Sequence, residues 1–401
     1  MGTKHSCVPF PSEAPYRVYV DDPAPYRQYL TQMLHQHPEL FPTAMDHGST
    51  FHDASMSITQ DLIGRRITVQ ATGAVFALRP AFVMPSMIAR TEEVEKGLSL
   101  RQWGAPCDAL ASVFGRDALL WYRAWLACGR PSLLGTTVKD PQQVPTDLVA
   151  DEQGTWVAGP EVDVPTTVGG GCFLGVSVVA AADTAALETG YGACAREAQA
   201  LVPDSHPRAV CTDGWHATRE AWRRLFPTIT LVRCFLHAVL KIMDRCRGEV
   251  RHHMLERTWR VSQATTKRQC VQRLRRLAEW TPMHRSGAVA AMVLQRWRRR
   301  ADFTPVSDCP PAHRTSHAVD RLLNYQDRLL AAMRYCHATT ASARLAVRAM
   351  ALQGNFHPYG ARLRREQPSR VSPFDDLNGW QYHPNWLHNL WIASSLGGLK
   401  L

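Results

Sequence analysis

The sequence predicts a mixed α/β protein, and the order of its local patterns carries that prediction. Three strand-like runs, at 148–151, 155–158 and 172–181, are followed by alternating helical and strand patterns. Such an order favours a sheet whose later strands are joined by crossover helices. The 401 residues are 45% hydrophobic and 20% charged, so the chain has enough apolar side chains for two or three domains.

The N-terminal region shows little periodicity before residue 64. Residues 1–60 are rich in Pro, His and Tyr, and they predict a loop-rich arm with one short helix near 25–35. Residues 64–79 alternate polar and apolar side chains around Thr72-Gly73, which is typical of a β-hairpin.

Residues 61–140 are interpreted as a DNA-binding region. Within it, 106–128 predict two short helices joined by a turn at Gly115. This pattern is typical of a helix-turn-helix, whose second helix enters the major groove of DNA, and also of an ordinary pair of antiparallel helices. In the first interpretation Arg116 and Arg123 face the nucleic acid.

Residues 141–355 are expected to form the catalytic core. Helices are predicted at 184–201 and 217–225, and strands at 208–212 and 229–234. The resulting order β-β-β-α-β-α-β-α matches a ribonuclease H-like arrangement. A basic helical insertion over about 245–310 and a long helix over 317–352 follow. Residues 356–401 show no helical or strand-like repeat of apolar residues, and they are interpreted as a C-terminal tail.

The charge balance indicates a polyanionic partner. The net charge is +11, and the insertion is especially rich in arginine, with Arg273, Arg276 and Arg298 among the candidates for phosphate contact. A solvated helical face is the alternative interpretation of such a run. Only six of the 46 basic residues are Lys, which phosphate recognition by Arg and a GC-rich genome would both explain.

Cysteine usage and hydropathy point to the cytoplasm. The eleven cysteines are scattered with no C-x-x-C pair, as in a reduced intracellular protein. The sequence has no secretory signal pattern and no apolar run long enough for a bilayer, so we expect no membrane association. It also lacks the phosphate-binding loop of P-loop ATPases.

Two aspartates follow apolar strand-like runs. Asp151 ends the run that begins at Leu148, and Asp213 follows the run 209–212 and precedes Gly214. Ligands bind outside the carboxyl ends of strands in such sheets. Two carboxylates there are typical ligands of Mg²⁺ or Mn²⁺, and two such ions can support phosphodiester chemistry. An isolated Asp before Gly is, however, also an ordinary turn residue.

A third carboxylate is needed to complete a two-ion site. Asp320, near the start of the helix predicted from residue 317, is our choice, with Asp327 and Glu279 as alternatives. Between the second and third acids lies Cys234-x-x-His237. Zinc would need two further ligands. A buried Cys with a hydrogen-bonded His that orients the sheet is therefore the preferred interpretation.

The order of these motifs resembles that of DDE transposases of bacterial insertion sequences, in the group related to mutator-like elements. The matching segments are LVADEQ, CTDGWHAT, RCFLH and RTSHAVDRL, and the resemblance extends over about residues 63–359. The third acid of that family is usually Glu, whereas this chain has Asp320.

The resemblance implies a protein that binds terminal inverted repeats in double-stranded DNA as a homo-oligomeric synaptic complex at the nucleoid. Metal-dependent hydrolysis at the element ends would release a 3′-hydroxyl, which then attacks target DNA. A stand-alone ribonuclease H-like nuclease and a catalytically inactive, transposase-derived DNA-binding protein are the alternatives.

Overall fold

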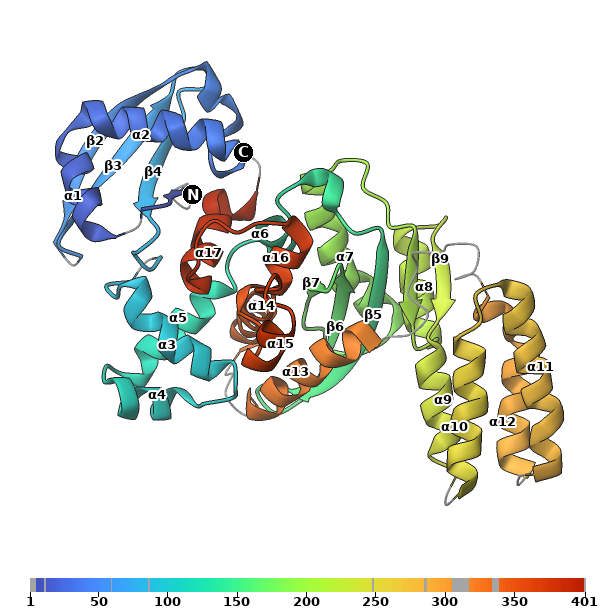
Figure 1. The fold of residues 1–401 in the computed structure, drawn as a ribbon. Helices are drawn as coiled ribbons and strands as arrows, with labels where there is room; N and C mark the ends of the chain where they lie inside the picture. Colours follow the sequence, from blue (N-terminus) through green and yellow to red (C-terminus); the bar gives the residue numbers. More distant parts are fainter. Residues whose placement is uncertain are drawn as a thin grey trace.

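The computed structural model describes residues 5–10, 12–58, 60–85, 87–246, 249–284, 287–304, 317–333 and 339–399. The predicted mixed α/β class is confirmed, because two β-sheets are combined with helices along the whole chain (Figure 1). A four-stranded sheet lies near the N-terminus, and a five-stranded sheet lies in the middle of the molecule.

The described residues between positions 5 and 80 form a small α/β unit. Its strands and helices are β1 (His5–Val8), α1 (Glu13–Asp21), α2 (Pro23–Gln36), the 3₁₀ turns η1 (Pro38–Leu40) and η2 (Thr43–His47), β2 (Ser49–Ser57), β3 (Leu62–Val69) and β4 (Val75–Pro80). The strand order is β1-β4-β3-β2, with β1 parallel to β4 and the other pairs antiparallel. Helices α1 and α2 cover one face of this sheet (Figure 1).

The prediction of a loop-rich arm at 1–60 is therefore wrong. Pro23 occupies the first turn of α2, where its missing N–H is no loss, and the Asp22 side chain caps that helix. Phe10, Tyr16 and Tyr26 pack against one another in the core of the unit. The hairpin predicted at 64–79 is confirmed, with Thr68 paired with Val75.

A block of helices follows. Its members are α3 (Thr91–Arg101), α4 (Cys107–Phe114), α5 (Ala118–Cys128), α6 (Leu133–Thr137) and the short η3 (Pro141–Gln143). The two helices predicted at 106–128 are present, and Gly115 between them adopts a φ of 71° that favours glycine. Helix α5 packs against both α14 and α3. Its buried Trp121 lies against Gly97 of α3, and the ring of buried Trp125 is covered by Arg101 of the same helix.

The five-stranded sheet has the order β7-β6-β5-β8-β9. Its strands are β5 (Asp147–Trp156), β6 (Glu161–Gly169), β7 (Cys172–Val176), β8 (Ala209–Thr212) and β9 (Thr230–Arg233). The first three strands pair antiparallel, and β8 and β9 extend the sheet in parallel with β5. Helices α7 (Thr184–Leu201) and α8 (His216–Leu225) connect the later strands and pack against each other.

The predicted order of three strands, helix, strand, helix, strand, helix is confirmed, but one strand was misplaced. Thr155 and Trp156 are the last residues of β5, residues 157 and 158 lie beyond it, and the second strand is β6. Its Pro165 and the glycines that follow it weaken the local strand signal, although Pro165 lies in register with Glu152 of β5.

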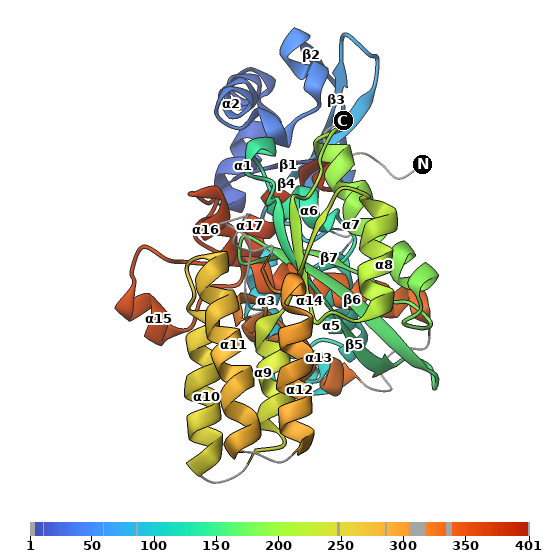
Figure 2. The same cartoon turned by 90° about the vertical axis from the view of Figure 1, so that its right-hand side faces the viewer.

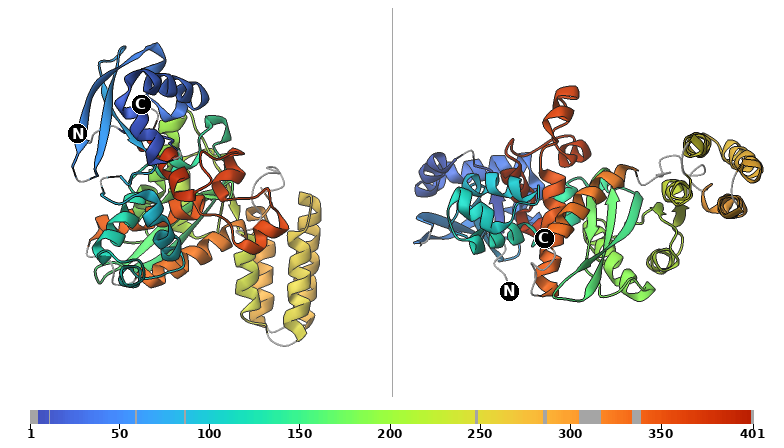
Figure 3. Two further views of the ribbon diagram at one scale, coloured as in Figure 1. Left: turned by 60° about the vertical axis from the view of Figure 1, so that its left-hand side comes forward. Right: turned by 90° about the horizontal axis from the view of Figure 1, so that it is seen from below.

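The basic insertion is helical as predicted. It is a four-helix unit of α9 (Phe235–Met243), α10 (Glu249–Ser262), α11 (Lys267–His284) and α12 (Gly287–Arg298), followed by η4 (Arg300–Asp302). The four helices lie side by side and enclose a separate apolar core that includes Met254, Leu274 and Val293 (Figure 2). This unit projects from the end of the molecule opposite the N-terminal sheet (Figure 3).

The C-terminal region contributes much of the central core. Its elements are α13 (His317–Met333), α14 (Thr340–Phe356), α15 (Ala361–Glu366), α16 (Pro373–Asn378), α17 (Trp386–Ala393) and η6 (Ser395–Gly398). The single helix predicted at 317–352 is wrong, because Thr339 is extended and its side chain caps a new helix, α14. The predicted tail is also wrong, since α17 is buried throughout and packs near β1.

Candidate active site

The structure brings Asp151, in the middle of β5, beside Asp213, which directly follows β8. The prediction that a strand ends at Asp151 is wrong, because β5 continues to Trp156 in its pairing with β6. Val149 of β5 and Cys211 of β8 are paired in parallel. Each aspartate lies two residues further along the chain, Asp151 within β5 and Asp213 just past the end of β8. Parallel strands place such positions at the same edge of the sheet. Both side chains are partly buried, and Asp213 is close enough for its negative charge to act on Asp151.

The environment of Asp151 disfavours an isolated negative charge. Burial raises the pKa of Asp151 to about 6, although the neighbouring His237 acts in the opposite direction; Asp213 raises it further. One Asp151 carboxylate oxygen accepts a hydrogen bond of 3.0 Å from the backbone N–H of Glu152. A cation near this pair would relieve the unfavourable burial and repulsion of the two carboxylates.

His237 supplies one positive charge to the site. It lies in the first turn of α9, with Nε2 3.9 Å from Oδ2 of Asp151. Interaction with Cys234, together with Asp151, raises the pKa of His237 to about 9, so the imidazole is protonated at neutral pH. Cys234 is buried at the start of α9, and its N–H donates to the Thr212 carbonyl in β8. The C-x-x-H segment thus ties α9 to the strand that precedes Asp213.

Asp213 is held by a tight turn. Its Oδ1 accepts a hydrogen bond of 2.7 Å from the Trp215 N–H, and Gly214 has a φ of 90°. The Arg233 side chain lies directly over this glycine, because a Cβ on Gly214 would lie only 2.6 Å from Nε of Arg233. The second acid therefore has an arginine from β9 packed beside its turn.

An arginine cluster, which sequence reasoning missed, surrounds Arg233. Arg219 and Arg233 each lie 3.8 Å from the same Asp302 carboxylate oxygen in η4. Burial lowers the pKa of Arg233, and the charges of Arg299 and Arg219 lower it further. Arg296 is 7% exposed, and burial and Arg233 lower its pKa as well. Several guanidinium groups therefore share one described carboxylate, an arrangement that favours an added anion.

Glu152 points away from Asp151, as the alternation of a strand predicts. Its Oε1 accepts hydrogen bonds from the hydroxyls of Tyr191, at 2.5 Å, and Thr218, at 2.6 Å. Burial raises the pKa of Glu152 to about 7. Glu152 therefore fastens β5 to α7 and α8 on the side away from Asp151.

The candidates for the third acid differ in position. Asp320 lies in α13, but its side chain falls outside the described part of the structure. Asp327 Oδ1 accepts a hydrogen bond of 2.5 Å from Gln153, which shares a face of β5 with Asp151. Burial raises the pKa of Asp327. Glu279 lies instead on α11, where it forms an ion pair with Arg275.

The predicted DNA-contacting arginines lie on two separate surfaces. Arg116 is in the turn between α4 and α5 and pairs with Glu93 at 3.5 Å, and Arg123 is exposed on α5. Arg276 and Arg298 are exposed on the four-helix unit, where Arg273 donates a hydrogen bond to the carbonyl of Arg260. Because α14 covers much of α5, only the outer side of that helix is open to a partner.

The site fits a divalent metal ion through its two hard carboxylate ligands. Among the described side chains, which do not include that of Asp320, no group of three or more His, Cys, Asp or Glu residues is arranged to hold a metal. This finding also gives no support for zinc at Cys234 and His237. Within the described residues, no helix combines the length and apolar character needed to cross a membrane.

Comparison with known proteins does not assign the chain to a family. No family model matches the sequence, and no curated protein is similar to it at a significant level.

Proposed function

We propose that the chain is a DNA transposase that cleaves element ends and transfers their 3′-hydroxyls into target DNA. The observation that supports this proposal most is the placement of Asp151, in β5, beside Asp213, which directly follows the neighbouring parallel strand β8. The element order from β5 to α9 supports a ribonuclease H-like core. Double-stranded DNA, a homo-oligomeric synaptic complex and a location at the nucleoid belong to the same proposal.

The candidate site offers groups suited to phosphodiester chemistry. Asp151 and Asp213, with Asp320 as the proposed third ligand, would hold Mg²⁺ or Mn²⁺, which would stabilise the charge that develops during in-line displacement at phosphorus. His237, protonated at neutral pH, restrains Asp151 from the α9 side. Arg219 and Arg233 lie next to the Asp213 turn and can hold a DNA phosphate.

The first test is cleavage of a DNA duplex that carries the terminal repeats, with Mg²⁺ or Mn²⁺ supplied. Asp151→Asn and Asp213→Asn should each lower the cleavage rate about 1,000-fold or more, because several kcal/mol of transition-state stabilisation would depend on them. Asp147→Asn, at the first residue of β5 and four residues before Asp151, is the matched control and should retain cleavage. Asp320→Asn compared with Asp327→Asn identifies the third acid.

Three outcomes separate the candidate functions. Cleavage followed by joining of the 3′-end to a target plasmid supports the transposase. Cleavage without joining would make the chain a nuclease. DNA binding without metal-dependent cleavage by the wild type would leave only the DNA-binding alternative.

A further inference from the structure

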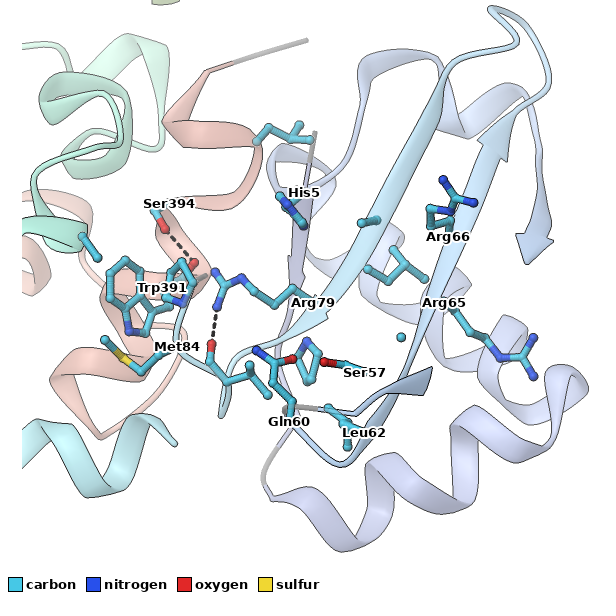
Figure 4. Close-up of a pocket in the computed structure, with 18 of the residues that line it drawn as sticks. His5, Ser57, Gln60, Leu62, Arg65, Arg66, Arg79, Met84, Trp391 and Ser394 are labelled. Carbon is cyan, nitrogen blue, oxygen red and sulfur yellow. Dashed lines mark hydrogen bonds between the residues drawn. The ribbon is translucent and has the colours of Figure 1, made fainter. Parts of the chain in front are cut away.

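The N-terminal sheet has a second face that its own helices do not cover. Alternation along the strands directs Ile67, Phe76 and Leu78 toward α1 and α2, where they are buried. Gly64 and Ala77 lie on the opposite face. That face forms the floor of a groove of about 790 Å³, walled by the segment after α5 and by α17 and the residues that follow it (Figure 4).

We propose that this groove binds the sugar–phosphate backbone of double-stranded DNA. None of the described residues that line it is Asp or Glu, whereas Arg66, Arg79 and Arg130 all contribute to its lining. Asp53, next to the groove, pairs with Arg66. Within the described structure, neither Arg79 nor Arg130 forms an ion pair with a carboxylate, so the groove carries excess positive charge that a polyanion would neutralise.

The position of Arg79 makes it the central contact. Figure 4 shows its side chain extending from β4 toward α17, while Arg65 points toward α1, where it donates hydrogen bonds to the Val20 carbonyl. One Arg79 nitrogen donates to the Val83 carbonyl at 2.6 Å, and the guanidinium lies 5.8 Å from the Trp391 ring centre. This support fixes the guanidinium in the wall of the groove, and its remaining N–H groups can bind a phosphate.

The lining favours a duplex backbone over unpaired bases. Single-stranded nucleic acid is usually held by stacking on exposed aromatic rings. The two lining aromatics, Tyr16 and Trp391, are 0% and 1% exposed, so their rings are not open to a base. The small side chains of Ser55, Gly64 and Ala77 instead leave room for a phosphate strand to approach the sheet.

The uncharged state of His5 is compatible with this role. Burial and the nearby Arg79 lower the pKa of His5, so the ring is neutral at pH 7 and adds a hydrogen-bonding group rather than a charge. Contacts of this kind position DNA without reading its sequence. The groove would hold a DNA segment away from the acids of the five-stranded sheet; the choice of DNA as the polyanion rests on the proposed function.

The test measures binding of a labelled duplex by fluorescence anisotropy at several salt concentrations. The full chain carries Asp213→Asn so that DNA is not cut. The double variant Arg79→Gln/Arg130→Gln should weaken binding about tenfold near physiological salt and reduce the slope of log K against log salt by about 2. The matched control, Arg17→Gln/Arg27→Gln, removes two charges from the helices on the covered face of the same sheet.

A second variant fills the groove without changing its charge. Gly64 has a single neighbouring atom within 4 Å of an added Cβ, the Ser55 carbonyl oxygen at 3.9 Å, so Gly64→Tyr is compatible with the strand. It should weaken DNA binding while the melting temperature stays close to that of the parent. Equal affinity and salt slope in the groove variants and the control would overturn the proposal.

The other outcomes are equally decisive. Competition by tripolyphosphate, with DNA affinity unchanged in Gly64→Tyr, would make the groove a site for small anions and overturn the duplex assignment. Normal DNA binding by the groove variants, together with metal-dependent cleavage by the wild-type chain, would reject the groove and leave the transposase proposal standing. If the groove variants weaken DNA binding but the wild-type chain never cleaves DNA, the transposase proposal is rejected and the groove proposal stands.

Discussion

His388 is a histidine whose protonation the fold opposes. Its side chain is 0% exposed in α17, and its ring stacks on His383 with 4.5 Å between centroids. In the described structure, neither of its ring nitrogens has a hydrogen-bond partner. Burial lowers the pKa of His388 to about 4, with a smaller effect from His383. The neutral imidazole is therefore part of the central apolar core.

We expect this residue to make the protein sensitive to acid. Between pH 6.5 and about 4 the unfolded chain binds more protons at this site than the folded one, so the free energy of unfolding falls as pH falls through that window. His388→Phe should remove about 1–3 kcal/mol of this pH dependence. Urea unfolding from pH 4 to 8 measures it, with the exposed His47→Gln as control. An unchanged pH profile in His388→Phe would contradict the assignment.

The close contact between α5 and α14 limits the surface that α5 can present to a partner. A Cβ on Gly129, at the end of α5, would overlap the carbonyl oxygen of Leu345 and lie 2.9 Å from the Ala349 nitrogen. The two helices approach this closely only because position 129 has no side chain. Helix α5 is thus as much a core element as a candidate for DNA recognition.

Gly129→Ala should separate these helices. We expect it to lower the free energy of unfolding by about 1–3 kcal/mol, because the added methyl group meets backbone atoms that cannot rotate away. Thermal unfolding measures the change. Gly360→Ala is the control, since a Cβ there meets nothing within 4 Å. Similar melting temperatures for the two variants would contradict this prediction, because they would show that α5 and α14 can move apart without loss of stability.

The elements that the sequence predicted well are those with strong local patterns. The helix at 184–201 and the strands around Val210 and Val232 were placed within a residue or two, and the position of Asp213 after β8 followed from them. The strand that contains Asp151 was cut short, because it continues through polar residues to Trp156. Apart from its β3–β4 hairpin, the N-terminal sheet was missed, because its parallel β1–β4 pair and its aromatic core depend on contacts between distant segments.

The same distinction applies to the candidate site. Asp151 and Asp213 were predictable, because each ends a short apolar run of its own. The cluster of Arg219, Arg233 and Asp302 was not, because η4 must first return to β9 across the whole four-helix unit. Similarly, the contact of Asp327 with Gln153 joins positions 174 residues apart.

At the scale of the whole molecule, the C-terminal segment holds the N-terminal unit in place. Ser395 Oγ accepts a hydrogen bond of 2.9 Å from the Cys7 N–H and donates one of 2.6 Å to the Leu40 carbonyl. Ser395 is 3% exposed. One buried hydroxyl therefore satisfies two backbone groups of the first 40 residues.

Ser395→Ala should leave both backbone groups without this partner. We expect a loss of about 1–3 kcal/mol in the free energy of unfolding, because each group remains desolvated. Ser394→Ala is the matched control, since its hydroxyl donates only to the Trp391 carbonyl within the preceding helix. Hydrogen exchange of the Cys7 amide localises the effect. Equal protection of that amide in both variants would contradict it.

The link between Cys7 and Ser395 spans 388 positions, and this separation has a consequence for biosynthesis. A ribosome makes the sheet of the N-terminal unit early, but the helix that walls its groove is translated more than three hundred residues later. During that interval the nascent chain exposes the sheet face beside Arg79. A chaperone that shields this face, or slow translation of the later codons, would therefore affect the yield of folded protein.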